Sequence, residues 1–243
     1  RHLFHSLLRF ASVAQGMITK GQPMIRHLPM FLSGLTAGRS LPSIAPQPFR
    51  DILPTIKQDV PNPKGKIAIF TGCLLDFVYV DIATDVVKAL NMAGYIVEMP
   101  LGQACCGAPA TYMGDVENAK KAAEMNLNAM EAEKYDYIVS ACPTCTHALR
   151  DYVDFFKDDP EMLKKAEELR SKTFDFCKLV SMLGGLPDTG DGVPMKVTYH
   201  DSCHLNRYLG VTKEQRELLK ATKGVELIEM HDCDKCCGFG GSY

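Results

Sequence analysis

The sequence has no run of about 18 or more apolar residues, so none of it is expected to span a membrane as a helix. Its first apolar run is not followed by a small-residue cleavage pattern, and we therefore expect no secretory signal peptide. The G-x-G-x-x-G fingerprint of dinucleotide binding is missing, and no pair of carboxylates stands out as an acid–base site. Membrane-embedded, secreted and dinucleotide-binding classes are thus disfavoured. The composition, 46% hydrophobic and 23% charged, is that of an ordinary globular protein.

Acidic residues are missing from the beginning of the chain, where residues 1–50 contain six Lys or Arg and no Asp or Glu. We interpret residues 1–62 as a basic helical leader or linker whose charges are solvated. The alternative is a segment that lies on an anionic membrane surface or on an acidic partner. Basic residues with interleaved aromatics are absent, so no nucleic-acid partner is expected. Because the first residue is not Met, we expect the chain to be part of a longer protein.

Cysteine, by contrast, is abundant, with ten in 243 residues. Without a secretion signal, this number indicates metal or redox chemistry more than a disulfide framework. Two pairs of cysteines are adjacent and precede a glycine, at Cys105-Cys106-Gly107 and Cys236-Cys237-Gly238. Adjacent cysteines are poorly placed for a disulfide with each other, because their Cα atoms are closer than a relaxed bond requires. They are better suited to bind a group between them, and the glycine permits positive φ and a close approach of the backbone to the sulfurs.

The two doublets belong to a larger repeat. In each copy an apolar run leads into a lone cysteine, Cys73 in the first copy and Cys203 in the second. The doublet then follows after 31 residues in the first copy and after 32 in the second. This agreement indicates two related domains in tandem, which we place at residues 63–185 and 194–243.

Apolar periodicity predicts strands that alternate with helices. In the first copy we expect strands at residues 66–70, 95–99 and 135–141, and helices at 81–93, at 115–133 and from about 146. In the second copy we expect a helix at residues 213–221 and a strand at 225–230. The predicted fold class is α/β, a tandem repeat of βαβ-type cysteine-rich domains with mostly parallel sheets. A helical or irregular leader precedes it, and the second repeat is truncated.

Parallel strands end at one edge of their sheet, where open α/β sheets bind ligands. Cys73, Cys105–106 and Cys142–145 each follow a predicted strand, so we expect their five thiols to converge. A structural zinc site uses four ligands, whereas iron–sulfur clusters accept thiolates from scattered loops. A zinc-holding structural module remains an alternative. The Cys142-x-x-Cys145 pair taken alone is also typical of a thioredoxin-type redox motif.

The spacing Cys73-x31-Cys105-Cys106-x35-Cys142-x2-Cys145 resembles the cysteine-rich CCG domain of iron–sulfur oxidoreductase subunits. That domain occurs in the iron–sulfur subunits of glycolate oxidase, of lactate-utilisation complexes and of anaerobic glycerol-3-phosphate dehydrogenase. It also occurs in the catalytic subunit of heterodisulfide reductase. The resemblance covers residues from about 62 to 243, and tandem copies are typical of the family.

The resemblance implies a [4Fe–4S] cluster, non-cubane in the heterodisulfide reductase type, on the five cysteines of the first copy. In the second copy Cys203, Cys236 and Cys237, with Gly238, match the motif, but its final C-x-x-C does not appear in the 243 residues. The second site is therefore expected to be incomplete in this chain, and whether it holds a second cluster is left open.

The resemblance further implies an oxidoreductase subunit, with electron transfer as the favoured role. A flavoprotein dehydrogenase subunit with FAD would oxidise glycolate, lactate or glycerol 3-phosphate. The clusters would then pass electrons to a ferredoxin-like iron–sulfur domain or subunit, or to a membrane quinone. The alternative is a catalytic cluster that reduces a disulfide, as in heterodisulfide reductase. A cleft beside the cluster would favour catalysis, and a covered cluster would favour transfer. The implied location is cytoplasmic, with peripheral attachment to the inner face of the membrane as an option.

Other cysteines and histidines lie outside the motif. Cys177 lies on an apolar helical stripe and is predicted to be a packed thiol. Cys233 is outside the family pattern, although it could assist the second site. His200 and His204 flank the lone cysteine of the second copy, and we expect structural roles for them. His147 is expected to begin a helix.

Overall fold

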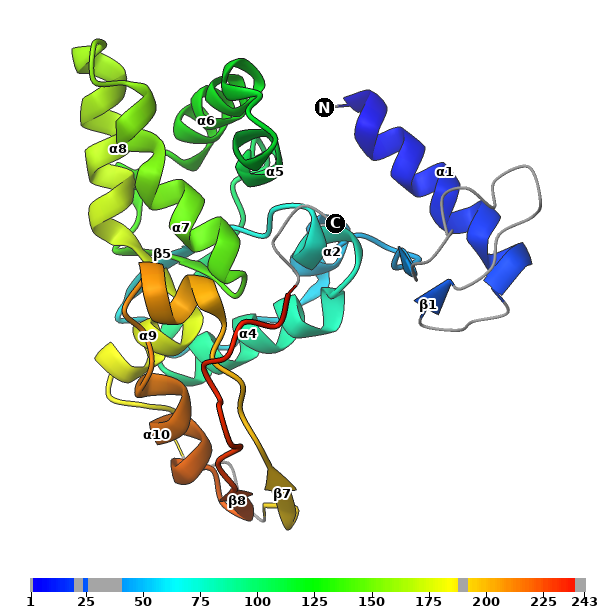
Figure 1. Ribbon diagram of the computed structural model, residues 1–243, viewed down its shortest axis with the longest axis vertical. Coiled ribbons are helices and arrows are strands. Elements are labelled where there is room, and N and C mark those ends of the chain that lie inside the picture. The colour runs from blue at the N-terminus through cyan, green and yellow to red at the C-terminus, as the bar shows by residue number, and fades with distance from the viewer. Residues whose placement is uncertain (1, 20–23, 26–40, 188–191, 239–243) are drawn as a thin grey trace. The chain divides into compact units, whose positions relative to one another are not determined.

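The computed structural model describes residues 2–19, 24–25, 41–187 and 192–238 (Figure 1). The chain divides into two units, a smaller one made of residues up to 57 together with 73–84, and a larger one made of residues 58–72 and 85 onward. Parts of the predicted leader, at 1, 20–23 and 26–40, lie outside the described residues. Within the described part of the chain, no helix is long and apolar enough to span a membrane.

A four-stranded parallel sheet forms the centre of the larger unit. Its strands are β3 (Gly65–Ile69), β4 (Tyr95–Glu98), β5 (Tyr137–Ser140) and β6 (Thr173–Asp175), in the spatial order β4-β3-β5-β6. The last three residues of β3 and of β5 are all buried, whichever face of the sheet they point to, as in parallel sheets that helices cover on both sides. The predicted α/β class is confirmed, and the three strands expected in the first copy are present. Strand β3 begins and ends one residue earlier than predicted, while β4 and β5 are shorter than predicted.

Helices follow each of these strands. They are α4 (Val80–Met92), α5 (Ala108–Tyr112), α6 (Val116–Met130), α7 (Pro143–Asp151), α8 (Pro160–Lys172) and α9 (Phe176–Met182). Two short 3₁₀ helices, η3 (Ala132–Lys134) and η4 (Tyr152–Phe155), follow α6 and α7. The alternation of strand and helix around β3, β4 and β5 is the one that the apolar periodicity predicted, whereas α5, α8 and β6 were not predicted.

The ends of α6 and α7 have local causes in the sequence. The Asp115 side chain accepts a main-chain N–H of the first turn and caps α6. The helix ends at Met130 and not at residue 133, because Glu131 adopts a left-handed conformation with φ of 42°. The next helix, α7, begins at Pro143, earlier than predicted. Proline suits a first helical position since its missing N–H has no partner there, and Cys142 becomes the N-cap.

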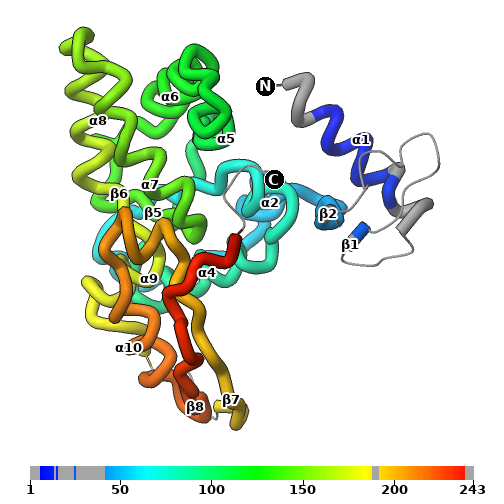
Figure 2. The backbone as a smooth tube through the Cα atoms, viewed as in Figure 1, coloured from blue at the N-terminus to red at the C-terminus, as the bar shows by residue number. Residues whose placement is uncertain are grey.

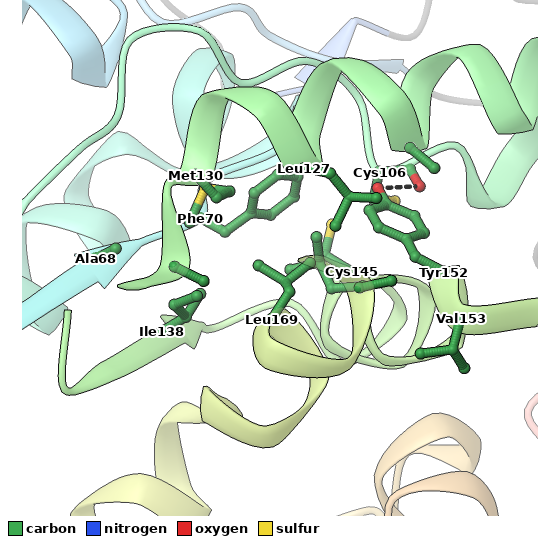
Figure 3. Close-up of a cluster of buried hydrophobic side chains, with 14 of the residues drawn as sticks. Ala68, Phe70, Cys106, Leu127, Met130, Ile138, Cys145, Tyr152, Val153 and Leu169 are labelled. Atoms are coloured by element: carbon green, nitrogen blue, oxygen red, sulfur yellow. Dashed lines mark hydrogen bonds between the residues drawn. The ribbon is translucent and has the colours of Figure 1, made fainter. Parts of the chain in front are cut away.

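A cluster of buried side chains fills the space between the sheet and helices α6, α7 and α8 (Figure 3). Phe70, Ile138 and Leu169 have almost no exposed surface. Fully burying one such side chain stabilises the folded state by about 1.5–3 kcal/mol. Cys106 and Cys145 belong to the same cluster, so two of the predicted ligands lie at the edge of the apolar core.

The second copy also belongs to the larger unit. It contains β7 (Met195–Val197), a π-helix η5 (His204–Tyr208), α10 (Glu214–Ala221) and β8 (Val225–Leu227). Strands β7 and β8 pair in parallel as a separate two-stranded sheet (Figure 2). The predicted helix is present and one residue shorter, and the predicted strand ends at Leu227. The second copy is the shorter of the two, as predicted.

The smaller unit contains α1 (His2–Thr19), β1 (Met24–Ile25), β2 (Leu41–Pro42), α2 (Phe49–Ile52), η2 (Leu53–Thr55) and α3 (Leu74–Phe77). Strands β1 and β2 are antiparallel. The carboxylate of Asp76 is fully buried and accepts hydrogen bonds from Arg50 Nε at 2.7 Å and from Arg50 N at 3.1 Å. This ion pair holds α2 against α3. The boundaries proposed for the leader and the two repeats stay predictions.

Candidate functional site

The loops after β4 and β5 bring four of the predicted ligands together. The Cys106 thiol hydrogen-bonds with Cys105, its neighbour in the doublet, and with Cys145 of α7. Cys145 in turn hydrogen-bonds with Cys142. The four sulfurs therefore form one connected group at the carboxyl ends of two parallel strands, the edge at which α/β sheets bind ligands.

Cys73, the fifth predicted ligand, belongs to the smaller unit. It is half-buried, lies at the N-cap of α3, and its carbonyl accepts the N–H of Phe77 at 3.1 Å. Its place among the ligands stays a prediction.

Three of the four grouped thiols, those of Cys106, Cys142 and Cys145, differ in acidity. A hydrogen bond from Cys145, together with N–H groups of Thr144 and Cys145 at the start of α7, lowers the pKa of Cys142 to about 7. A hydrogen bond to Cys105, reinforced by burial, raises the pKa of Cys106 to about 12. Hydrogen bonds to Cys106 and Cys142 raise the pKa of Cys145 well above its usual range. Cys142 is thus the first of these three thiols to lose its proton.

This donor set fits a positively charged metal cluster. Cys106 and Cys145 are each 5% exposed, so thiolates at these positions would be buried anions without a counter-charge. Metal ions supply that charge and displace the thiol protons. Among the described residues, no three His, Cys, Asp or Glu side chains form a ready site for a single metal ion.

Two glycines permit the close packing of these loops. Gly107, which follows the doublet, has a φ of 83°, and a Cβ there would lie 3.3 Å from the carbonyl oxygen of Ala119 in α6. Gly72 has a φ of 57°, and a Cβ there would lie 3.0 Å from Cys145 Sγ. The positive φ predicted for Gly107 is confirmed. Its close approach is to the backbone of α6, whereas the glycine that approaches a sulfur is Gly72.

Gln103 links the doublet loop to the end of β3, and the sequence analysis did not identify it. Its side chain is 1% exposed. The Oε1 atom accepts hydrogen bonds from Thr71 N at 2.9 Å and from the Thr71 hydroxyl at 3.2 Å, and Nε2 donates to Ile69 O at 3.0 Å. These bonds fix the loop that begins at Gln103 against the strand end that leads to Cys73.

Asn126 and Tyr152 contact the backbone of the doublet, and they too were missed. Both side chains have no exposed surface. Asn126 bonds with Ala104 N and Cys105 O, and the Tyr152 hydroxyl donates to Cys106 O at 2.9 Å. The only sequence signal is that Asn126 interrupts the apolar face of α6, where a polar side chain needs buried partners.

Rings from both copies meet beside the four thiols. The Tyr112 hydroxyl is 2.7 Å from His204 Nε2, and the ring of His147 lies 5.6 Å from His204 and 4.5 Å from Tyr208. Burial, followed by the charge of Cys106, raises the pKa of Tyr112 to about 12. Helix η5 of the second copy therefore packs on α5 and α7 of the first. His147 lies within α7, not at its start.

The thiols of the second motif are more accessible. Cys203 is half-buried at the N-cap of η5, while Cys236 and Cys237 are exposed. The loops that carry them are tied together, since Asp201 N donates to Cys233 O at 2.7 Å and His200 Nε2 is 2.8 Å from Lys235 O.

An ion-pair network explains the position of Cys233. Arg216 donates to both carboxylate oxygens of Asp201, at 2.9 and 3.1 Å, and to Glu229 Oε1 at 2.8 Å. The Cys233 sulfur accepts from Arg216 Nη2 at 3.3 Å and its thiol points to Asp201 Oδ2 at 3.5 Å. Its thiol is thus engaged by charged side chains.

Cys177 follows β6 and is separate from the four-thiol group. It is half-buried in α9, where its N–H donates to Asp175 Oδ1 at 2.9 Å. Burial, with the nearby Asp175 carboxylate, raises the pKa of its thiol to about 12.

Two cavities lie elsewhere on the larger unit. The first, of about 710 Å³, is lined by residues that include Arg150, Leu163 and Phe174. The second, of about 230 Å³, lies between α6 and α8 and is lined by residues that include Glu131 and Lys165. Neither lining contains a cysteine.

Comparison with known proteins identifies related sequences. The family model of the cysteine-rich (CCG) domain matches residues 67–150 and 197–243. The chain is 38% identical to Lactate utilization protein A of Bacillus velezensis over 178 residues, which is 73% of this chain and 74% of that protein. It is 36% identical to Lactate utilization protein A of Bacillus subtilis over the same shares. It is 37% identical to that of Shouchella clausii over 177 residues, 73% of each chain.

Proposed function

The chain belongs to the cysteine-rich (CCG) domain family, and we propose that it is an iron–sulfur subunit that transfers electrons in an oxidoreductase acting on lactate. The substrate class comes from the relatives, which are named for lactate utilization and are 36–38% identical. Glycolate and glycerol 3-phosphate have no such support among these relatives.

The connected group of four thiols is the observation that carries the proposal. Cys105, Cys106, Cys142 and Cys145 would hold the cluster, with Cys73 as the fifth ligand that the family spacing implies. A [4Fe–4S] cluster would supply storage of one electron at this edge of the sheet. The chain's own contribution is to hold the sulfurs in place, to exclude water from two of them and to direct the N–H groups of α7 toward Cys142.

Burial favours electron transfer over reduction of a disulfide. A disulfide substrate must bring a sulfur atom to the reacting group, whereas an electron can cross a protein layer. Cys106 and Cys145 are only 5% exposed, and neither of the two cavities contains a cysteine. Cys105 and Cys142 are half-buried, so the site is covered at two of its four sulfurs, and this cover supports transfer.

The remaining members of the electron path are proposed on other chains or domains. A flavoprotein subunit with FAD would take the two electrons and the protons released when lactate becomes pyruvate. This chain would receive the electrons one at a time and pass them to a ferredoxin-like iron–sulfur domain or to a membrane quinone. The second motif, Cys203 with Cys236 and Cys237, would complete a further site only with additional ligands.

Metal analysis of protein purified without oxygen tests the proposal. The expected result is about four irons and four acid-labile sulfides per chain, with an electron paramagnetic resonance signal after reduction. Cys145→Ser should lose most of the iron. Cys177→Ser is the control, since Cys177 also follows a strand of the same sheet and is half-buried, and this variant should keep the iron. Stoichiometric zinc without iron would refute the proposal.

A second assay separates transfer from disulfide reduction. The purified flavoprotein partner and lactate should reduce the cluster, while lactate alone should not. Reduction of small organic disulfides by the pre-reduced chain, at a rate that Cys145→Ser abolishes, would instead establish the catalytic alternative.

A further inference from the structure

Asn126 and Tyr152 hold the backbone of the cysteine doublet at three consecutive residues. Asn126 Oδ1 accepts from Ala104 N at 2.7 Å, and its Nδ2 donates to Cys105 O at 2.9 Å. Tyr152 donates to Cys106 O at 2.9 Å, as Figure 3 shows, and Asn126 Nδ2 also donates to the Tyr152 hydroxyl at 2.9 Å. The two side chains and the backbone of residues 104–106 thus form one closed network of hydrogen bonds.

The doublet depends on this network because it has no regular secondary structure of its own. Residues 103–106 lie in the loop between β4 and α5. Asn126 comes from the middle of α6, and Tyr152 is the first residue of η4, directly after α7. Since α7 also carries Cys145, the Tyr152 bond sets the distance between the doublet and the C-x-x-C pair.

The network also determines which backbone dipoles face the sulfurs. The carbonyl oxygens of Cys105 and Cys106 are the negative ends of their peptide dipoles, and both are held by donors from α6 and η4. On the other side, the Cys106 sulfur accepts a main-chain N–H from Ala108. An anionic group bound at the Cys106 sulfur would therefore lie near the Ala108 N–H, while the two carbonyl oxygens of the doublet are held by other donors. An N–H group near the cluster favours the more negative, reduced form.

We propose that Asn126 and Tyr152 are positioning residues that fix the two sulfurs of the doublet and raise the reduction potential of the cluster held there. This inference rests on the proposed iron–sulfur function. Their total burial and their shared hydrogen bond mean that neither can move without leaving a buried carbonyl or N–H of the doublet without a partner.

The variant Tyr152→Phe tests the proposal with the least disturbance, because it keeps the ring in the core and removes one hydroxyl. In the reduced, metal-free protein, iodoacetamide should alkylate Cys106 about tenfold faster than in the wild type, since opening of the loop no longer breaks this hydrogen bond. In the iron-loaded protein, the midpoint potential should become more negative and the electron paramagnetic resonance lines should broaden. Asn126→Leu, which removes all the bonds of the amide, should give larger changes of the same sign.

Tyr135→Phe is the matched control. The Tyr135 hydroxyl also donates one side-chain hydrogen bond, to Glu98 Oε2 at 3.3 Å, but it does not touch the doublet. This variant should leave the alkylation rate, the potential and the spectrum unchanged. If Tyr152→Phe also leaves them unchanged in a protein whose wild type carries iron, the positioning role is wrong. Equal changes in Tyr152→Phe and Tyr135→Phe would mean that both substitutions act by lowering the overall stability, and this result would also refute the positioning role.

The outcomes for the two proposals are separable. A wild type without iron refutes the proposed function, while the alkylation rates of the metal-free protein still decide whether Tyr152 fixes the doublet. If alkylation of Cys106 is equally slow in the wild type and in Tyr152→Phe, the positioning inference fails whatever the metal content.

Discussion

The glycines of the two Cys-Cys-Gly triplets provide a matched pair for a substitution to alanine. Gly107 and Gly238 have nearly the same backbone conformation, with φ of 83° and 78°. They differ in their surroundings. A Cβ at Gly107 would lie 3.3 Å from the Ala119 carbonyl oxygen and 3.5 Å from the Cβ of Ala122, whereas around Gly238 nothing among the described residues lies within 4 Å.

The expected loss of stability has two contributions, the left-handed backbone conformation and the contacts of the added Cβ. A residue with a Cβ in the left-handed region costs about 1–2 kcal/mol, and this cost applies to both positions. At Gly107 the added methyl group also pushes against the backbone of α6, which cannot yield as a flexible side chain does, and such overpacking costs about 1–3 kcal/mol. We therefore expect Gly107→Ala to lose roughly 2–5 kcal/mol of the free energy of unfolding and Gly238→Ala at most about 1–2 kcal/mol.

Urea unfolding of the reduced, metal-free proteins at 25 °C, followed by far-ultraviolet circular dichroism, measures both losses. Iron content after reconstitution gives an independent result, since a shift of the doublet away from α6 should lower the loading of Gly107→Ala only. Equal losses in the two variants would mean that packing against α6 contributes nothing. A loss below about 1 kcal/mol in Gly107→Ala would contradict the left-handed conformation itself.

Three further substitutions or titrations have distinct outcomes. In the metal-free protein, the alkylation rate of Cys142 should rise as pH increases through about 7, because its lowered pKa makes it a thiolate there. Cys177, with a pKa of about 12, should be alkylated slowly over the same range. Mass spectrometry measures both rates, and equal rates at pH 7.5 would contradict the lowered pKa of Cys142. In the smaller unit, Asp76→Asn should cost about 3 kcal/mol of the free energy of unfolding, since it removes the negative charge from a largely buried ion pair. Asp51→Asn, whose ion pair is exposed, should cost less than about 1 kcal/mol. Urea unfolding measures both costs, and similar values would refute the difference. Tyr112→Phe removes the hydroxyl that contacts His204 of the second copy. An iron chelator should therefore remove the cluster from this variant faster than from the wild type. An unchanged rate of removal would show that η5 does not protect the site.

The alternation of strands and helices was predictable because it depends on local patterns. Residues 67–70 form a short apolar run with two isoleucines, and the last three residues of the strand found there, β3, are all buried. The Asp115 cap was predictable for the same reason, since a helix N-terminus needs an acceptor within a few residues. The end of α6 was not, because the left-handed conformation of Glu131 has no signal in a residue of that type.

The candidate ligands were also predictable, for a reason that is partly topological. Once β4 and β5 are parallel neighbours of β3, the loops after them must meet at one edge of the sheet, and the cysteines in those loops meet with them. The spacing in the sequence predicted a group of five cysteines. The structure brings four of them together, Cys105, Cys106, Cys142 and Cys145, and the place of Cys73 stays a prediction.

The sequence by itself determined the element types, the repeat and which cysteines form a motif, because periodicity, capping and spacing are properties of neighbouring residues. Only the tertiary structure decided how the motif is held. Gln103, Asn126 and Tyr152 contact the loops across 21 to 46 residues of chain, and a buried amide or hydroxyl has no partner until the fold supplies one. The acidity of Cys142 was decided there too, since it depends on a thiol and N–H groups that approach its sulfur only when α7 begins at Pro143.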